Sequence, residues 1–526
     1  PAPGASSFGY HASMSTPTRY TDTRGLDSSR PTFSQAVVKG IAPGGGLFVP
    51  EELPTFALGE ILALSAMPYW QRAATVFERF GVDVAPGRVA ALMQTAYGPQ
   101  WDDERIAPVV EVVADMHVLE LWHGPTSAFK DMALQCMPLF FSEAVETMQA
   151  AGELADDYLV LVATSGDTGK AALDGFADRA HTGIVVFYPD GGVSDVQRLQ
   201  MVTQRGENVG VFGVRGNFDD CQSAVKAAFS DESFNAELHE KHGLKLSSAN
   251  SINWGRLLPQ IAYYVSAYAD MVASGGVKPG APMDVCVPTG NFGNILGAYY
   301  ARLVGVPIGR LLCASNENNV LADFIATGTY DISARPFVTT PSPSMDILIS
   351  SNLERLLYHL ADAEAVRGWM AELASKRRFT VDRATFAAVR GLFSGDWVTN
   401  DESLATIARV YAETGYLMDA HTAVAWEVAE RLRGEDPVLV VSTAHWAKFG
   451  ADVYRALTGV PYGGALEGDA ARMSGLQLLD EVRRLAPGGA PIPAPLAELG
   501  TLPERFASVV DAGRGGIEGA VREWLG

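Results

Sequence analysis

The sequence has few cysteines, no long apolar run and a shortage of positive charge. Its 526 residues include four cysteines (Cys136, Cys221, Cys286 and Cys313), and none has the paired spacing of a metal site. We therefore expect reduced, buried thiols in a cytoplasmic protein. No uninterrupted apolar stretch reaches about 18 residues and the start has no basic-then-apolar signal pattern, so neither a membrane span nor secretion is predicted.

The charge balance excludes further classes of partner. The chain carries 40 Lys and Arg against 61 Asp and Glu, a formal net charge of −21 at pH 7. This argues against nucleic acid or an anionic membrane as a partner. It also opposes long-range attraction of an anionic small molecule, so a site for such a substrate must concentrate positive charge locally.

Length and composition favour a large α/β enzyme. At 526 residues the chain is too long for one core, which predicts two or three domains. Its 53 glycines and 48% hydrophobic content are typical of an α/β protein with many tight turns. The segment 1–13 is rich in small residues and takes no part in the fold prediction.

Hydrophobic periodicity divides the first half of the chain. Residues 14–108 predict a helical N-terminal domain, and residues 151–275 predict a small α/β domain with a parallel sheet and right-handed crossovers. The expected N-terminal helices are 33–38, 60–67, 69–80 and 88–97. The expected elements of the small domain are strands 158–163, 183–188, 209–214 and 244–247, and helices 170–181, 194–205 and 218–242.

A second parallel sheet is expected in a large domain formed by 109–150 and 276–462. Its strands would be 284–288, 310–314 and 438–442, and one more strand at 109–117 would lead into the first motif. A helical insertion covers about 345–430, clearest at 345–359 and 363–373, and 463–526 predict a C-terminal extension. Ligands of such sheets bind beyond the carboxyl ends of the strands, where the following motifs fall.

The first motif is the segment 121–135, called here the lysine turn, which places Lys130 at a helix start. A Gly-Pro turn precedes it, and the apolar helical run 132–148 follows. The helix dipole and packing beside Phe129 both disfavour the ammonium form. The neutral amine that they favour can attack a carbonyl to form a Schiff base. On this segment alone, a surface lysine after a tight turn is the favoured interpretation, and the loops described next reverse that preference.

The second motif is Pro288-Thr-Gly-Asn-Phe-Gly-Asn294, called here the glycine loop, between an apolar strand and a helix. Gly290 and Gly293 let the backbone approach a ligand closely, and Asn291 and Asn294 tolerate left-handed conformations. With the helix dipole, these features favour a phosphate site. An ordinary strand-to-helix turn with an Asn cap is the alternative.

The third motif, Thr164-Ser-Gly-Asp-Thr-Gly169, is called here the hydroxyl loop and also joins a strand to a helix. It is not a P-loop, because Thr164 stands where glycine is required and Ala171 where a Mg²⁺-binding hydroxyl is required. Its hydroxyls and backbone donors suit a smaller anion, such as an amino-acid carboxylate. Asp167 is expected to accept hydrogen bonds from N–H groups of its own turn rather than to face the anion.

The fourth motif is Asn250-Ser-Ile-Asn-Trp-Gly-Arg256, which leads into the apolar helix 257–271. It offers neutral donors and the planar guanidinium fork that suits phosphate. An N-cap followed by a solvated arginine is the alternative. Together the four motifs predict a pyridoxal-phosphate enzyme whose amino-acid substrate carries its own phosphate.

At these residues the sequence resembles threonine synthase of the long yeast and enterobacterial type. The four motifs and Ser442-Thr-Ala-His-Trp-Ala-Lys-Phe449 are similar to motifs of that family, and 20–25 and 33–50 resemble its opening. The resemblance covers nearly the whole chain. Trp446 departs from it, since proline is expected after the histidine, which questions the shape of that loop but not the role of Thr443.

The resemblance implies a fold and an activity. The fold is two parallel-sheet α/β domains of the tryptophan-synthase-β-like class, fold type II, with a helical N-terminal domain. The activity is that of a carbon–oxygen lyase acting on phosphates, which converts O-phospho-L-homoserine and water to L-threonine and phosphate with pyridoxal 5'-phosphate. The enzyme would be a cytoplasmic monomer or homodimer.

The resemblance also implies roles for single residues. Lys130 would hold the cofactor and act as base, and Thr443 would face the ring nitrogen. The cofactor phosphate would be held by Gly290, Asn291, Phe292, Gly293 and Asn294. The substrate carboxylate would be bound by Ser165, Gly166, Thr168 and Thr126, and the substrate phosphate by Asn253 and Arg256. His445 and Lys448 have weaker expectations, for which a structural role is as good an explanation.

Two alternatives stay open. A serine/threonine dehydratase or β-replacing synthase of the same fold would share Lys130 and the glycine loop, but it would not need the 250–256 cluster. A catalytically inactive sensor of amino acids or nucleotides would have no use for an amine at Lys130.

Overall fold

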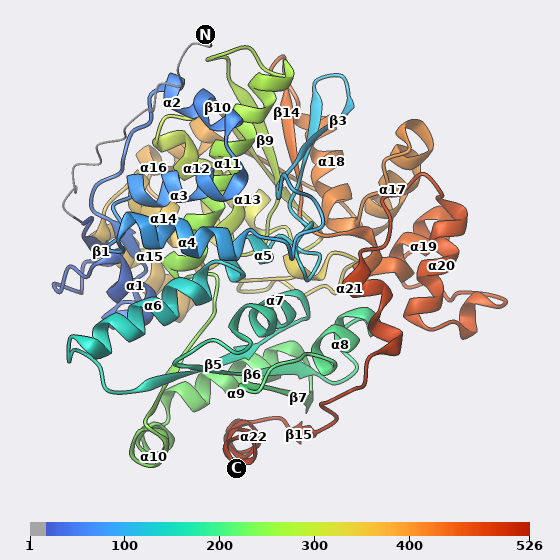
Figure 1. The fold of residues 1–526 in the computed structure, drawn as a ribbon. Helices are drawn as coiled ribbons and strands as arrows, with labels where there is room; N and C mark the ends of the chain where they lie inside the picture. Colours follow the sequence, from blue (N-terminus) through green and yellow to red (C-terminus); the bar gives the residue numbers. More distant parts are fainter. Residues whose placement is uncertain (1–16) are drawn as a thin grey trace, which may run out of the picture.

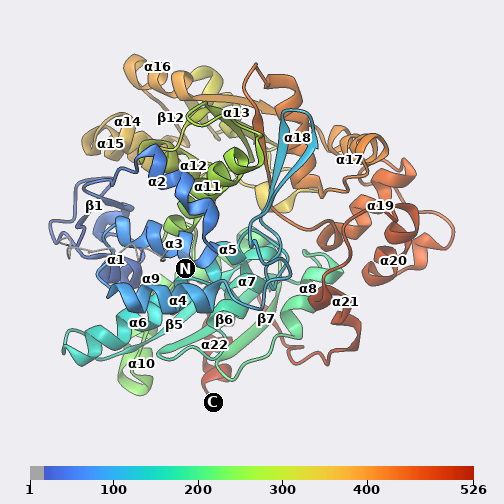
Figure 2. The ribbon, with the colours of Figure 1, turned by 45° about the horizontal axis from the view of Figure 1, so that its top comes forward.

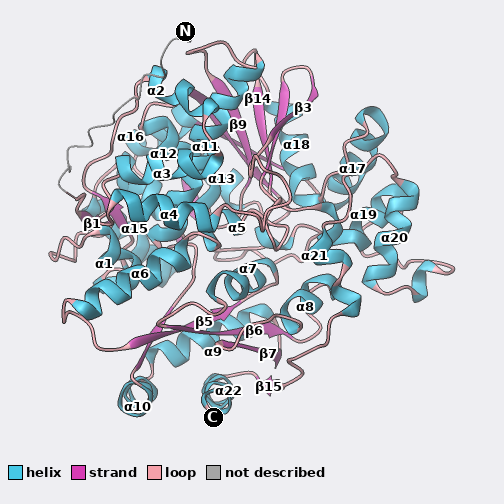
Figure 3. Cartoon of the chain, in the orientation of Figure 1, coloured by secondary structure: helices cyan, strands magenta, loops and turns pink. Residues whose placement is uncertain are grey.

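The computed structural model describes residues 17–526, in which helices surround two main β-sheets (Figures 1 and 3). The small-residue segment 1–13 lies outside the described residues. In Figure 1 the larger sheet stands in the upper part of the molecule and the smaller sheet lies beneath it. Two α/β units with a helical N-terminal region confirm the predicted fold class.

The larger sheet has the strand order β13-β10-β9-β14-β4-β3, and β3 alone pairs antiparallel in it. Its strands are β3 (Val109–Val113), β4 (Met116–Glu120), β9 (Met283–Pro288), β10 (Ile308–Ser315), β13 (Phe393–Trp397) and β14 (Val438–Ser442). The prediction of one strand at 109–117 was wrong. Asp115 adopts a φ of 63°, and the segment folds into the β3–β4 hairpin.

Both faces of the larger sheet are covered by helices. Val285 and Val287 of β9 share a core with α11 (Trp254–Ser274) and α12 (Gly293–Leu303). Cys286, between them, packs on the opposite face with α18 (Ala420–Leu432). Strands that are buried on both faces read as continuous apolar runs, which is why β9 and β14 were predictable from the sequence.

The smaller sheet is parallel throughout, with the order β15-β7-β6-β5-β8. Its strands are β5 (Asp157–Ala163), β6 (Thr182–Pro189), β7 (Val209–Arg215), β8 (Leu244–Ser247) and β15 (Val509–Asp511). The four predicted strands are confirmed, and the C-terminal extension adds β15 at the edge beside β7. In Figure 1, α7 (Asp167–Phe176) and α8 (Asp195–Val202) lie between this sheet and the larger one.

Two groups of helices flank the molecule (Figure 2). The first flank holds α1 (Phe33–Lys39), α2 (Leu58–Ala63), α3 (Tyr69–Arg79), α4 (Pro86–Ala96) and α6 (Met137–Ala150), and the short buried α5 (Asp131–Leu134) lies inside, against α11 and α7. The second holds α17 (Asn400–Thr414), α19 (Gly450–Thr458), α20 (Gly475–Leu485) and α21 (Ala494–Ala497). Elsewhere lie α9 (Phe218–Ser230), α10 (Glu232–His242), α13 (Val320–Thr327), α14 (Leu353–Leu360), α15 (Ala363–Lys376), α16 (Arg383–Leu392) and α22 (Arg514–Leu525). None of the described helices combines the length and apolarity needed to cross a bilayer.

Short paired strands and two helix boundaries complete the fold. The two small sheets pair β1 (Tyr20–Asp22) with β2 (Phe48–Pro50) and β11 (Thr329–Asp331) with β12 (Arg378–Thr380). A helix at 345–359 was wrong in its first half, because α14 begins only at Leu353. A single helix at 218–242 was also wrong. Asp231 ends α9 and caps α10, since its Oδ1 accepts from the Phe234 N–H at 2.9 Å.

Candidate functional site

The lysine turn is held by hydrogen bonds within itself. Asp131 accepts from the Thr126 backbone N–H at 2.8 Å and from the Thr126 hydroxyl at 2.6 Å. Gly124 packs directly on this pair, since an added Cβ would lie 2.5 Å from Asp131. The turn therefore fixes where Lys130 emerges, at the start of α5. The hydroxyl of Thr126 is engaged by the turn, so direct contact of Thr126 with the substrate stays a prediction.

Lys130 is buried and poorly satisfied. Its residue is 9% exposed, and its Nζ donates to the Ser344 hydroxyl at 3.3 Å and lies 4.7 Å from the centre of the Phe129 ring. Burial lowers the pKa of this amine to about 8, although the Asp167 carboxylate acts in the opposite direction. The amine is therefore much easier to deprotonate than that of an ordinary lysine.

The lysine turn is joined to the segment that follows β14. Ala128 and Ala444 form an antiparallel bridge, the Phe129 N–H donates to the Thr443 carbonyl at 2.8 Å, and the His445 N–H donates to the Ser127 carbonyl at 3.1 Å. These bonds bring Thr443 beside Lys130. The Thr443 residue is buried, and its hydroxyl has no hydrogen-bond partner within residues 17–526.

The glycine loop connects β9 to α12. Phe292 holds a left-handed φ of 63°, and α12 begins at Gly293. A Cβ on Gly290 would lie 2.8 Å from the Ser344 carbonyl oxygen, whereas one on Gly293 would lie 3.5 Å from its nearest neighbour, Asn352 Nδ2. Gly290 is thus required by packing, while a Cβ on Gly293, at a helix N-terminus, would meet only ordinary contacts with the Asn352 and Gln260 side chains.

Asn294 presents a donor with nothing to bind. Its Oδ1 accepts from the Tyr263 and Tyr264 hydroxyls at 2.7 and 2.5 Å, which fixes the orientation of the amide. Its Nδ2 is buried without a hydrogen-bond partner among the described residues. Buried polar groups in folded proteins are nearly always paired, so this donor indicates a missing acceptor at the start of α12.

The hydroxyl loop is capped by Thr164. Its hydroxyl accepts from the N–H groups of Gly166 and Gly169 at 3.0 and 2.8 Å. The prediction that Asp167 performs this task was wrong, because the hydroxyl of Thr164 already occupies the turn. The hydroxyls of Ser165 and Thr168 are half-buried and have no partner in the described part of the chain, so both are available to a ligand.

Asp167 instead points into a buried network. One carboxylate oxygen accepts from Gln197 Nε2 at 3.0 Å and lies 3.2 Å from Lys448 Nζ, and the other accepts from the Ser344 hydroxyl at 3.0 Å. Burial opposes its ionisation, but the Lys448 and Lys130 charges hold the pKa of the Asp167 carboxyl well below its usual range. A permanent negative charge therefore lies beside Lys130.

Arg256 is a buried cation without a carboxylate partner among the described residues. It is 3% exposed, donates through Nη1 to the Ala249 carbonyl at 2.7 Å and leaves its Nε unpaired. Asn253, by contrast, has a hydrogen-bond partner at both ends of its amide. Its Oδ1 accepts from the Gly255 N–H at 2.9 Å and its Nδ2 donates to the Val37 carbonyl at 2.8 Å. A ligand role for Asn253 stays a prediction, whereas Arg256 is ready for an anion.

Sequence reasoning missed the segment 339–352, called here the serine segment, which links the loops. Its Ser344 contacts Lys130 and Asp167, and its Ser350 hydroxyl donates to the Gly290 carbonyl at 2.7 Å. Asp346 anchors the segment by accepting from Thr340, Asn316 and Asn318 side chains at 2.7, 2.8 and 3.0 Å. The helix predicted from residue 345 covered much of this segment, and no local pattern in it pointed to Lys130 or Asp167.

Two histidines near the lysine turn differ in charge. His123 lies between Asp102 and Glu120, at 2.5 and 3.0 Å, and these carboxylates raise its pKa to about 9 against the effect of burial. His445 is fully buried, and burial lowers its pKa to about 3. Its Nδ1 accepts from the Ala447 N–H at 3.1 Å. His445 is therefore neutral and supports the loop of Thr443.

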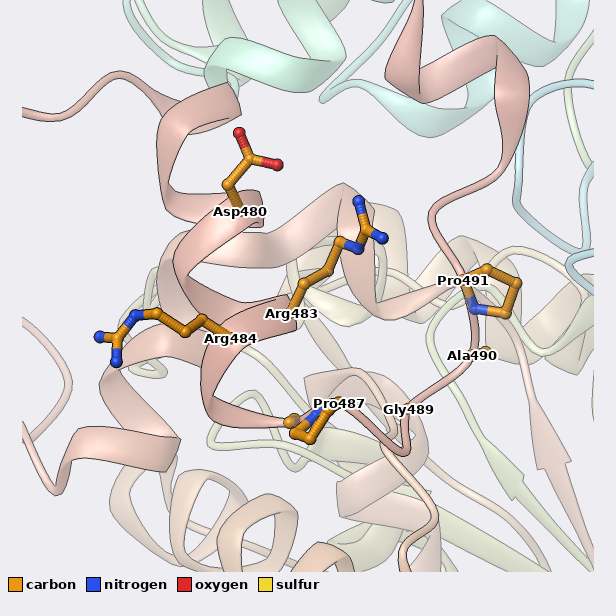
Figure 4. A pocket seen from close by; sticks show the side chains of 8 residues that line it. Asp480, Arg483, Arg484, Pro487, Gly489, Ala490 and Pro491 are labelled. Atoms are coloured by element: carbon orange, nitrogen blue, oxygen red, sulfur yellow. The ribbon is translucent and has the colours of Figure 1, made fainter.

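Trp446, which stands where the resembled family motif has proline, makes a contact of its own. Its indole N–H donates to the Ala490 carbonyl at 2.9 Å, which ties the loop of Thr443 to the C-terminal extension. Beside this joint lies the pocket of Figure 4, to which α20 contributes Asp480, Arg483 and Arg484. It contains none of the predicted site residues. Within residues 17–526 no group of three or more His, Cys, Asp or Glu side chains is arranged to hold a metal.

Three family models match successive parts of the chain. Residues 19–97 match the threonine synthase N terminus, residues 111–444 match a pyridoxal-phosphate dependent enzyme, and residues 422–518 match the threonine synthase C-terminal region. The second match contains the lysine turn, the hydroxyl loop, the glycine loop and Arg256.

Relatives of known name agree with these matches. Human threonine synthase-like 1 is 44% identical over 81% of this chain, which spans 58% of that protein's length. Threonine synthase of Saccharomyces cerevisiae is 36% identical over 84% of this chain and 89% of its own. The crystal structure of a threonine synthase from Brucella melitensis with bound PLP superposes with a TM-score of 0.82 at 36% identity, covering 96% of this chain and 99% of that one.

Proposed function

The chain belongs to the threonine synthase family, and we propose that it converts O-phospho-L-homoserine and water to L-threonine and phosphate with pyridoxal 5'-phosphate as cofactor. The observation that carries this proposal is Lys130, a buried lysine whose pKa is lowered to about 8 and whose amine is bound by a single hydroxyl. A sensor that only binds its ligand would not need such an amine.

The described residues fit the cofactor. Its phosphate would be held by the N-terminus of α12, the backbone at Gly293 and the unpaired Nδ2 of Asn294. The free hydroxyl of Thr443 would face its ring nitrogen, and Lys130 would bind its aldehyde. When bound, this cofactor supplies a carbonyl that joins the substrate amine and a ring that withdraws electrons from Cα. Because Thr443 is a neutral hydroxyl, it would not hold the ring nitrogen protonated as a carboxylate would.

Side chains and backbone groups of the protein then have separate roles in the proposed reaction. Lys130 Nζ would take the proton from the substrate Cα, return it to the substrate–cofactor system, and only then take a second proton from Cβ. Ser165, Gly166 and Thr168 hold the substrate carboxylate with hydroxyls and backbone donors. Arg256 pairs with the phosphate that leaves from Cγ, before water adds at Cβ. This placement concentrates the positive charge that an acidic chain of net charge −21 does not provide at long range.

Arg256 favours a phosphorylated substrate over that of a dehydratase. Burying a guanidinium is unfavourable unless an anion compensates, and none of the described carboxylates pairs with it. The decisive assay measures phosphate release and threonine formation from O-phosphohomoserine beside keto-acid formation from serine. Equal turnover of serine, with Arg256→Ala leaving it unchanged, would contradict the proposal and favour the dehydratase.

The place of action and the assembly are further parts of the proposal. The four cysteines are free and buried, which supports a reducing compartment such as the cytoplasm. A monomer and a homodimer both agree with the proposal, and sedimentation of the purified enzyme distinguishes them.

A further inference from the structure

Ser344 occupies a central position in the site. Its hydroxyl accepts from Lys130 Nζ at 3.3 Å and donates to Asp167 at 3.0 Å, so it lies directly between the amine and the carboxylate. Its backbone N–H donates to His421 Nε2 at 3.1 Å, and His421 Nδ1 faces Asp419 at 2.6 Å. The main chain of Ser344 is thus held by His421, and its hydroxyl is used only for the bonds with Lys130 and Asp167.

Asp167 stays ionised because the positive charge of a second lysine, Lys448, compensates its negative charge. Lys448 is 0% exposed and lies 3.2 Å from Asp167. It also donates to the Thr126 carbonyl at 2.7 Å and to Gln200 at 2.8 Å. All three of its N–H donors are therefore used, and none remains to bind another acceptor in the site.

From this geometry we infer that Ser344 and Asp167 form a hydroxyl-to-carboxylate relay that orients the released Lys130 amine and stabilises its protonated form. The inference rests on the proposed function and adds positioning residues to it. When Lys130 Nζ takes the Cα proton, the resulting ammonium donates to Ser344, whose O–H donates to Asp167. No proton passes to Asp167. Its negative charge compensates the ammonium through the serine dipole, so the proton stays on Lys130 for delivery.

The charges around Lys130 make this compensation necessary. Arg256 on α11 and Lys448 next to α19 both disfavour the ammonium, and burial acts in the same direction. Asp167 on α7 and Asp131 on α5 oppose them. Asp131 is committed to Thr126, which leaves Asp167 as the carboxylate that reaches Lys130 through a hydrogen bond.

The test measures the titration of Lys130 in the full-length chain freed of cofactor. Acetic anhydride, a small reagent that acetylates neutral amines, is applied at a series of pH values. Mass spectrometry then compares the extent of acetylation of Lys130 with that of the exposed Lys278. Wild type is expected to become half-reactive near pH 8. Ser344→Ala removes the hydroxyl and should shift the midpoint down by about one pH unit, which is a tenfold loss of proton affinity.

Two further variants separate the relay from a structural effect. Ser344→Thr keeps the hydroxyl and should restore the wild-type midpoint. Asp167→Asn should lower the midpoint at least as far as Ser344→Ala, and it is interpreted only if thermal melting shows a folded protein. In the holoenzyme, Ser344→Ala should lower kcat and leave KM for O-phosphohomoserine nearly unchanged.

The outcomes distinguish the relay from the proposed function. Equal midpoints in wild type, Ser344→Ala and Ser344→Thr would overturn the relay even if threonine is formed. A shifted midpoint in Ser344→Ala, found together with no turnover of O-phosphohomoserine by wild type, would support the relay and overturn the proposed function instead.

Discussion

Lys130 and Lys448 are two buried lysines that share the carboxylate of Asp167, and the structure treats them in opposite ways. Lys448 faces three acceptors, at 2.7, 2.8 and 3.2 Å. Lys130 has one hydroxyl at 3.3 Å. A buried ammonium is stable only when its donors are satisfied. The comparison therefore teaches that the number of acceptors decides which lysine holds the fold together and which one is free for chemistry.

Two arginines repeat this contrast. Arg355 is fully buried and donates through Nε, Nη1 and Nη2 to Phe48, Asn352 and Ile252 at 3.0, 2.5 and 2.6 Å. Arg256 makes one such bond and leaves Nε unpaired. We expect loss of Arg355 to weaken the fold and loss of Arg256 to weaken substrate binding.

The largest expected effect follows from removing Lys130. Lys130→Ala should lower threonine formation by at least about 10²–10⁴-fold, the usual contribution of a positioned acid or base, while the thermal midpoint stays close to that of wild type. Borohydride reduction of the wild-type holoenzyme followed by peptide mapping should find the cofactor on Lys130. An adduct on Lys170 or Lys448 would overturn the assignment of Lys130 as the cofactor lysine.

Removing Lys448 should affect stability first. Lys448→Met leaves the Asp167 charge buried and uncompensated, a loss that typically costs about 3–5 kcal/mol of unfolding free energy. Chemical denaturation measures it. Lys376→Met is the matched control, because Lys376 pairs with Glu372 at the surface and should change stability by roughly 0.5 kcal/mol or less. Similar losses in both variants would mean that the Asp167–Lys448 pair contributes no more than a surface ion pair.

The parts of this contrast that the sequence revealed are local. The glycine loop and the lysine turn are continuous strand–turn–helix patterns, so short-range rules identify them. Ser344 was not identified as a site residue from the sequence, because its partners Lys130 and Asp167 lie 214 and 177 residues away in the chain. Asp167 was misassigned for a related reason. Two side chains could cap the same turn, and only the fold shows that Thr164 does so while Asp167 meets Lys448.

Arg256→Ala tests whether the incompletely bonded arginine binds substrate, in contrast to Arg355, which stabilises the fold. Losing a desolvated, charge-assisted pair typically costs about 2–5 kcal/mol, which is on the order of thirty-fold or more in kcat/KM for O-phosphohomoserine. The cofactor absorbance of the resting enzyme should remain. Arg355→Ala should instead lower the thermal midpoint. Wild-type kcat/KM in Arg256→Ala would place the substrate phosphate elsewhere.

Gly293→Val applies the same reasoning to the glycine loop. An added Cβ has room within the protein, 3.5 Å from Asn352, but it would occupy the proposed phosphate site. Cofactor affinity should fall by about 1–3 kcal/mol, as in other overpacked sites, with little change in folding. Gly290→Val, whose Cβ would lie 2.8 Å from the Ser344 carbonyl, should damage folding as well. Equilibrium dialysis measures cofactor affinity and thermal melting measures stability. Unchanged cofactor affinity in Gly293→Val would mean that the cofactor phosphate binds elsewhere.

The smallest expected effect concerns pH and compares His123 with His445. Burial opposes the charge on His123, but Asp102 and Glu120 raise its pKa to about 9, above the unfolded value of about 6.5. The folded state therefore binds more protons between these values. Its stabilisation, about 1–3 kcal/mol, is fully present below pH 6.5 and is lost as pH rises through 9.

Denaturation of wild type and His123→Phe at a series of pH values isolates this contribution, because all other titrating groups cancel in the difference. The difference should shrink steadily from pH 6.5 to 9.5. His445→Phe should show no such trend, since burial lowers the pKa of His445 to about 3 and keeps it neutral throughout this range. A pH-independent difference for His123→Phe would mean that His123 is neutral too. The two carboxylates would then orient the imidazole as hydrogen-bond acceptors without charging it.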